Sequence, residues 1–201
     1  MSAIFVRGVL VSCSEVCVMI RLLSRLLMMF GVLWITAAIA RLWSRDHNVS
    51  VASVGRLVET QLRKAAKIAG SGVPMLIESY GVPNARSDGS RILYNPKWVA
   101  SIVRRYRRNP RCSEALVMGA MAHELSHFFS EDGSDALQHS VDCELKADGW
   151  AGYVLGRRKL PRKDFERIID DLSLVCGEVG APTDLRAHAI RSGYREGLGM
   201  I

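Results

Sequence analysis

Apolar residues recur every three or four positions along most of the chain after residue 50, which predicts a mainly helical domain. The predicted helices cover residues 51–70, 97–108, 113–129, 142–158, 161–176 and 183–197. Gly70 is typical of a helix end and Pro161 of a helix start. Ser113 is the expected N-cap of the third helix, with Glu114 in its first turn.

The stretch from residue 73 to 96 has a different pattern, in which short apolar runs alternate with Gly, Pro, Asn and Asp. This pattern predicts two short strands around a turn near Asp88 and Gly89. Helices with a small sheet indicate an α+β fold that is mostly helical. We expect one such domain over residues 41–201.

The first forty residues have a composition of their own. Leu26–Ala40 is a run of 15 residues without a charge, with Arg21 and Arg25 before it. A basic segment, a short apolar run and a final Ala-x-Ala are typical of a secretory signal, here cleaved after Ala40. Its proportions fit a translation start at Met19 better than one at Met1.

The same stretch has a second interpretation. The apolar run is short for a membrane span, but residues 22–40 together could form a retained, tilted N-terminal anchor. Arginines before the run favour a cytoplasmic N-terminus and an exported C-terminal domain. We therefore expect the protein in the periplasm, or anchored to the outer face of the cytoplasmic membrane.

The formal net charge of +7 comes largely from arginine, with clusters at Arg104–Arg111 and Arg157–Lys163. Such clusters can bind nucleic acid or an anionic membrane. No known nucleic-acid motif accompanies them, so a solvated basic face is the better interpretation and no nucleic-acid partner is expected.

Two histidines stand four residues apart in the most apolar of the predicted helices, in the stretch GAMAHELSHFF. His123 and His127 therefore project from one helix face, one turn apart, and both ring nitrogens can reach a single metal ion. Glu124 is rotated by about 100° from His123, close enough to act on a water at the metal without being a ligand. The HExxH pattern predicts a zinc site with Glu124 as the general base.

A catalytic zinc ion needs a third protein ligand, and Glu144 is favoured over His139. His139 is twelve residues from His127 and does not complete the HExxHxxGxxH pattern. Glu144 lies at the start of a predicted helix, with Asp148 four residues later on the same face. Asp148 could then accept the free ring N–H of a ligand histidine.

The stretch AHELSH, followed by ELKADGWAGYVLGR, resembles the gluzincin-type metallopeptidases, which combine HExxH with a downstream ExxxD. It is similar in particular to the family of the CAAX prenyl proteases and bacterial membrane or periplasmic heat-shock metalloproteases. The resemblance runs from about Pro83 to Tyr194 and includes VPNARSDGSRILYNP. It implies a zincin-like fold and one zinc ion per chain, with the site residues His123, His127 and Glu144 as ligands, Glu124 as base and Asp148 as a supporting acceptor.

The chain departs from this family at one place. Relatives often carry His-Pro shortly before a final R..AI..GY segment, where this chain has Thr183-Asp184. The role of that histidine in relatives therefore has no direct counterpart here. Arg186 and His188 are the candidates to replace it.

These features together predict a zinc-dependent metalloendopeptidase that acts on a protein or peptide substrate. Arg91–Asn95 is either the sheet edge along which an extended substrate lies or an ordinary short edge strand. One alternative is a cytosolic metallopeptidase of the repressor-cleaving kind, which the signal-like leader disfavours. The other is an exported zinc-binding domain without activity, which an intact Glu124 disfavours. The sequence does not indicate an oligomeric state.

Overall fold

The computed structural model describes residues 3–6, 9–12, 50–129, 140–175 and 181–200. The chain divides into two compact units, Met1–Asn48 and Val49–Ile201. In the first, β1 (Ala3–Val6) and β2 (Val9–Ser12) pair as an antiparallel hairpin. Within the described ranges no helix has the length and apolar character that a membrane span requires. The predicted signal or anchor over 22–40 lies outside these ranges.

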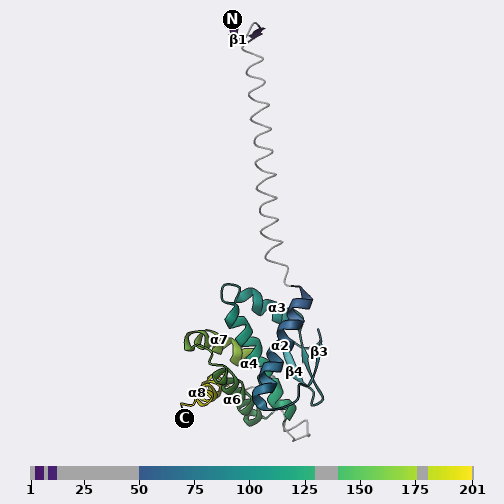
Figure 1. Ribbon diagram of the computed structural model, residues 1–201, viewed down its shortest axis with the longest axis vertical. Coiled ribbons are helices and arrows are strands. Elements are labelled where there is room, and N and C mark those ends of the chain that lie inside the picture. The colour runs from purple at the N-terminus through teal and green to yellow at the C-terminus, as the bar shows by residue number, and fades with distance from the viewer. Residues whose placement is uncertain (1–2, 7–8, 13–49, 130–139, 176–180, 201) are drawn as a thin grey trace. The chain divides into compact units, whose positions relative to one another are not determined.

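The unit Val49–Ile201 is mostly helical with a small sheet, which confirms the expected α+β class (Figure 1). Its helices are α2 (Val51–Ala69), α3 (Pro96–Arg105), α4 (Pro110–Phe129), α6 (Val141–Arg157), α7 (Arg162–Val175) and α8 (Thr183–Gly197). Its strands are β3 (Met75–Glu78), β4 (Ala85–Ser87) and β5 (Arg91–Tyr94).

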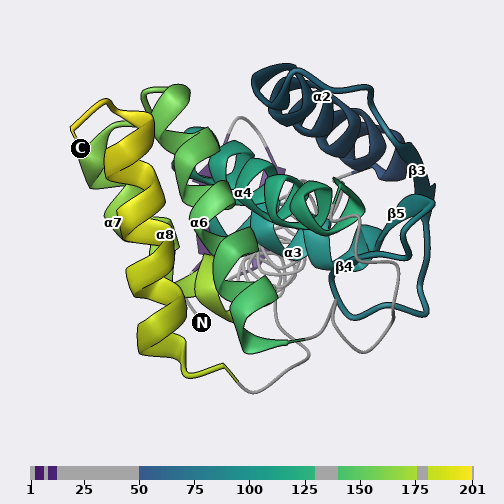
Figure 2. The same ribbon diagram turned by 90° about the horizontal axis from the view of Figure 1, so that it is seen from below.

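Helix α4 lies at the centre of this unit. Figure 2 shows α2 and the sheet on one side of it and α6, α7 and α8 on the other. From Cys112 to Leu125 every residue of α4 except Glu114 is buried. A helix that is apolar all round must be covered on all sides, and the neighbouring helices and strands supply that cover.

The start of α4 differs from the prediction. The helix begins at Pro110, not after an N-cap at Ser113. The proline ring presets a helical φ, and proline has no N–H that would be left without a partner in the first turn. Ser113 is buried inside the first turn, where its hydroxyl donates to the carbonyl of Pro110 at 2.8 Å. Helix α3 also ends earlier than predicted, at Arg105.

The sheet has the strand order β3-β5-β4. Strands β4 and β5 form the predicted hairpin, and Gly89 takes a positive φ of 79° in its turn. Strand β3, parallel to β5, is a third strand that the pattern did not predict. Because β5 contains Arg91–Tyr94 and lies in the middle, the expectation that this segment forms a sheet edge is wrong.

Helices α6 and α8 pack backbone to backbone. A Cβ atom added at Gly152 would overlap the carbonyl oxygen of Ile190, and one added at Gly193 would overlap that of Gly149. Farther along, Gly156 and Gly197 allow the same close approach. The glycines thus bring α8 close enough to α6 for a side chain near the start of α8 to reach the buried face of α6.

Candidate metal centre

Three side chains from two helices meet at one point. His123 and His127 come from α4 and Glu144 from α6, and one donor atom from each lies within 4.8 Å of the others. The two Nε2 atoms are 3.0 Å apart, and the oxygens of Glu144 lie 3.3 Å from Nε2 of His123 and 3.4 Å from Nε2 of His127. Bonds of 2.0–2.1 Å in a tetrahedron would space the ligand atoms by about 3.3 Å. The group could therefore hold a metal ion.

The start of α6 determines where Glu144 lies. Ser140 is the N-cap, and its hydroxyl oxygen accepts a hydrogen bond from the backbone N–H of Cys143 at 3.2 Å. Glu144 thus lies in the first turn of α6, where the positive end of the helix dipole stabilises its carboxylate. Its side chain faces the half of α4 that carries the histidines.

Two observations on buried groups favour a cation at this site. Oε2 of Glu144 is a buried atom that makes no hydrogen bond to any described residue, although Nε2 of His123 is 3.3 Å away. Glu124, Glu144 and Asp148 are buried with the guanidinium of Arg186. When all are ionised, two negative charges remain, and burying uncompensated charge is costly. A divalent ion would balance them and bond the free oxygen.

Asp148 connects the group to α8. Its Oδ1 lies 3.1 Å from Nδ1 of His123, and Arg186 donates to both of its oxygens at 2.7 and 2.8 Å. Asp148 is 1% and Arg186 4% exposed, so this pair of hydrogen bonds between the guanidinium and the carboxylate is shielded from water. Because the paired Asp148 is an acceptor, the Nδ1–H of His123 points to it and leaves Nε2 for a metal.

Without a metal ion, the pKa values of the ligand side chains shift in opposite directions. Burial alone would lower the pKa of His123, but the hydrogen bond with Asp148 and the close carboxylate of Glu144 outweigh burial and raise the pKa to about 9. Burial alone would raise the pKa of Glu144, but the close imidazoles of His123 and His127 lower it to about 2. The metal-free site therefore keeps an extra proton on His123 at neutral pH.

Glu124 lies beside the group but is held by the sheet. Its Oε2 accepts a hydrogen bond of 2.7 Å from the backbone N–H of Ser87, in strand β4. Burial raises the pKa of Glu124, partly opposed by the charges of His123 and His127. A carboxylate with a raised pKa, fixed in place near two imidazoles, is suited to exchange protons with a neighbouring molecule.

The turn after Ser87 is itself fixed by a side chain. Oδ1 of Asp88 accepts from the backbone N–H groups of Ser90 and Arg91 at 3.1 and 2.9 Å, and Oδ2 accepts from Nε of Arg91 at 2.7 Å. The bond from Arg91 holds the pKa of Asp88 well below its usual range. The sequence SDGSR thus sets the conformation of the turn that follows strand β4. This turn fixes the position of Ser87, whose N–H donates to Glu124.

The other sequence candidates fall into two classes. Arg186 is buried and contacts Asp148, which in turn contacts His123. His188, on the same helix, is exposed. His139 lies outside the described residues. The hydrogen bonds from Arg186 and the amide of Ser87 are contacts that sequence reasoning missed. The sequence contains one weak signal for Arg186, namely that it begins the R..AI..GY segment, which follows the expected zinc residues along the chain.

Comparison of the chain with protein-family models, curated proteins and solved structures found no match.

Proposed function

We propose that this protein is a zinc-dependent metalloendopeptidase with a zincin-like domain. The observation that carries the proposal is the separation of roles among buried side chains. His123, His127 and Glu144 converge on one point, while Glu124, adjacent in sequence to a ligand, is held by Ser87 instead. A purely structural metal site has no use for such a carboxylate.

Each residue then has a defined task in peptide hydrolysis. Zinc, when bound, acts as a Lewis acid towards water and the substrate carbonyl. Glu124 accepts a proton from the attacking water and passes it to the leaving amine nitrogen. Asp148 and Arg186 hold the ring of His123 in the orientation that presents Nε2.

The proposed substrate is an extended protein or peptide segment. Strand β4, not β5, lies at an edge of the sheet, and its residue Ser87 already contacts Glu124. A peptide that pairs with β4 would place its backbone beside the base and the ligand group. We further propose that the domain is exported, on the basis of the apolar run Leu26–Ala40.

The test compares three Glu→Gln variants of the full chain. Glu124→Gln should lower the rate of peptide hydrolysis by roughly 10²–10⁴-fold, because an amide cannot accept the proton. It should leave bound zinc at one per chain. Glu144→Gln should lose zinc and activity together, because it removes an anionic ligand. Glu114→Gln, an exposed change on the same helix as Glu124, is the matched control and should alter neither.

Elemental analysis and cleavage of casein or a fluorogenic peptide library provide the two measurements. Zinc retained with no hydrolysis in the unmodified chain would support a non-enzymatic zinc-binding domain. Unchanged hydrolysis in Glu124→Gln would show that the roles are assigned wrongly.

A further inference from the structure

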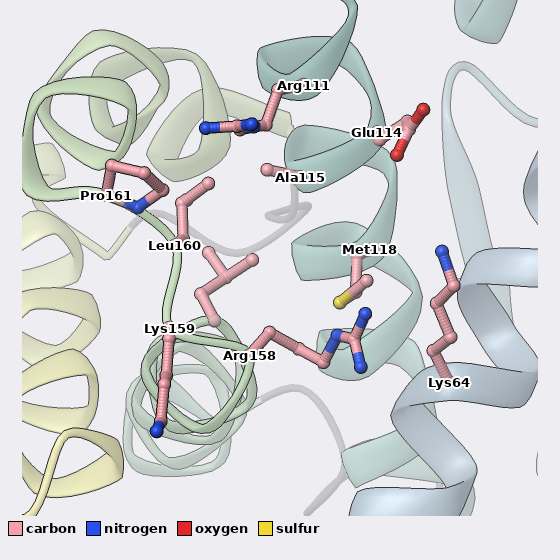
Figure 3. A pocket seen from close by; sticks show the side chains of 10 residues that line it. Lys64, Arg111, Glu114, Ala115, Met118, Arg158, Lys159, Leu160 and Pro161 are labelled. Atoms are coloured by element: carbon pink, nitrogen blue, oxygen red, sulfur yellow. The ribbon is translucent and has the colours of Figure 1, made fainter.

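A pocket lies between α2, α4 and the connection from α6 to α7, with a volume of about 390 Å³ (Figure 3). None of its lining residues belongs to the metal group. A water molecule takes about 30 Å³ of liquid, so the pocket has room for about a dozen waters. It therefore has room for an organic anion.

Four cationic residues line this pocket, and in Figure 3 the side chain of Lys159 points away from the other three. In Figure 3 Arg111 lies above Ala115, Arg158 lies below Met118, and Lys64 reaches in from α2. The guanidinium of Arg158 makes no hydrogen bond or ion pair with any described residue. The contacts of Lys64 and Arg111 are long, 3.4 Å from Lys64 to Gln61 and 3.9 Å from Arg111 to Asp164. Like charges gathered at one pocket repel each other, and an anion would offset that repulsion.

The lining between these cations is apolar. It consists of the buried side chains Ala115, Met118, Leu155 and Leu160. Glu114 is the carboxylate among the described lining residues; it is exposed, and in Figure 3 it points away from Arg158. The pocket thus combines a positive rim with an apolar floor, which suits a ligand with an anionic head and an apolar body.

The connection that forms one wall has a fixed conformation. The amide of Leu160 donates to the carbonyl of Leu155 at 3.2 Å, and the amide of Lys159 donates to that of Gly156 at 2.8 Å. Lys159 takes the left-handed conformation, with φ 52°, that this type of helix end requires. The hydroxyl of Tyr194 donates to the carbonyl of Leu160 at 2.5 Å. The wall is therefore formed before any ligand binds.

We propose that this pocket binds a phosphate monoester carried on an apolar chain. A phosphate ester presents three terminal oxygens to the three cations, and arginine forks match phosphate oxygens in pairs. The chain would lie on the apolar floor. The same chemistry occurs in the headgroup end of an acidic phospholipid and in a free organic phosphate.

The binding test uses the full, zinc-loaded chain and isothermal titration calorimetry with soluble probes. Hexyl phosphate should bind at least tenfold more tightly than inorganic phosphate, 1-hexanol or hexanoate, because only it joins a phosphate to an apolar chain. Dihexanoyl phosphatidate distinguishes the two sources. If dihexanoyl phosphatidate binds more tightly than hexyl phosphate, the ligand is a phospholipid. If hexyl phosphate binds more tightly, the ligand is a free organic phosphate.

Two neighbouring arginines at the end of α6 provide a matched pair of variants. Arg158→Gln should weaken binding of hexyl phosphate about tenfold or more, the effect of losing one charge-assisted contact. Arg157→Gln removes the same charge from an exposed residue that does not line the pocket, and should change binding less than twofold. Neither side chain has a partner among the described residues, so thermal unfolding should be the same for both variants.

Several results would overturn the proposal. They are equal binding of inorganic and hexyl phosphate, equal binding of hexanoate and hexyl phosphate, equal losses in the two arginine variants, or no binding of either phosphate ester. Because the pocket and the metal group share no residue, each of these outcomes is independent of whether the chain hydrolyses peptides.

Discussion

The carboxylate of Asp148 has two partners at once, the imidazole of His123 and the guanidinium of Arg186. Arg186→Met would leave that carboxylate buried with its counter-ion removed. Breaking a buried pair in this way typically costs about 3–5 kcal/mol of unfolding free energy. Loss of a group that orients a ligand typically weakens metal affinity by about 10–100-fold. Urea unfolding with chelator present and zinc competition assays measure the two effects.

Two further variants show which property of Arg186 matters. Arg186→Lys keeps the charge but not the two-pronged geometry, so it should fall between wild type and Arg186→Met. Arg191→Met changes a surface arginine on the same helix, 3.6 Å from Glu166, and should change stability by less than about 1 kcal/mol. Equal effects at positions 186 and 191 would contradict the positioning role.

The proton on His123 predicts how zinc affinity depends on pH. In the metal-free protein the pKa of His123 is raised to about 9, so zinc must displace a proton at any lower pH. Apparent affinity should therefore rise by about tenfold per pH unit between pH 7 and 8.5 and level off above 9. Chelator competition at a series of pH values tests this. Asp148→Asn removes the main partner that raises the pKa and should flatten the slope; a flat slope in wild type would contradict the prediction.

At the scale of single residues, the sequence predicts the site residues that share one helix. His123, Glu124 and His127 can be read from spacing alone, and Glu144 with Asp148 from a second helix face. Arg186 lies 38 residues beyond Asp148, and only tertiary packing brings the two together. The contact from Ser87 could not be predicted either, because a backbone amide leaves no mark in the sequence.

At the scale of elements, the close packing of α6 on α8 determines where Arg186 lies. Gly152→Ala would drive a Cβ into the carbonyl of Ile190, which can be avoided only if the helices move apart. We expect a loss of about 3 kcal/mol in unfolding free energy, at the upper end of overpacking effects. Weaker zinc binding should accompany it, because α8 would carry Arg186 away from Asp148.

Gly149→Ala on the same helix is the control for this variant. A Cβ there would meet its nearest atom, the carbonyl oxygen of Ala189, at an ordinary 3.9 Å. Alanine in a helix interior is better than glycine by about 1 kcal/mol, so this variant should be as stable as wild type or more so. Denaturant unfolding of the two variants side by side would contradict the packing argument if both lost stability equally.

The elements show a similar limit to sequence-based prediction. The extent of α2 and the β4–β5 hairpin follow from local signals, namely Gly70 at a helix end and Asp88-Gly89 in a turn. Strand β3 was missed because its parallel pairing with β5 is not a local property. The start of α4 was misplaced because Ser113 and Pro110 are both valid start signals, and burial of Ser113 decides between them.

At the scale of the whole molecule, a bound metal would tie α4 to α6. At a free zinc concentration 1,000 times the dissociation constant, binding adds about 4 kcal/mol to the stability of the folded state. For a unit the size of Val49–Ile201, this corresponds to a rise in Tm of roughly 10 °C. Calorimetry with zinc and with a chelator measures the shift.

The ion and the ligands each provide a control for this experiment. Magnesium prefers six oxygen ligands and should give little stabilisation at a site with two imidazoles. Replacing both His123 and His127 by alanine should abolish the zinc effect. Stabilisation by magnesium equal to that by zinc would contradict the proposed ligand set.

The all-round burial of α4 also has a consequence for which substitutions the chain can accumulate. A half-exposed helix can change its outer face freely, but from Cys112 to Leu125 only Glu114 offers such a position. Each other side chain there must fit a neighbour in α2, α3, α6, α7 or the sheet. Sequence drift should therefore be slowest along α4 and faster on the helices around it, so α4 should remain recognisable in distant descendants after the rest has changed.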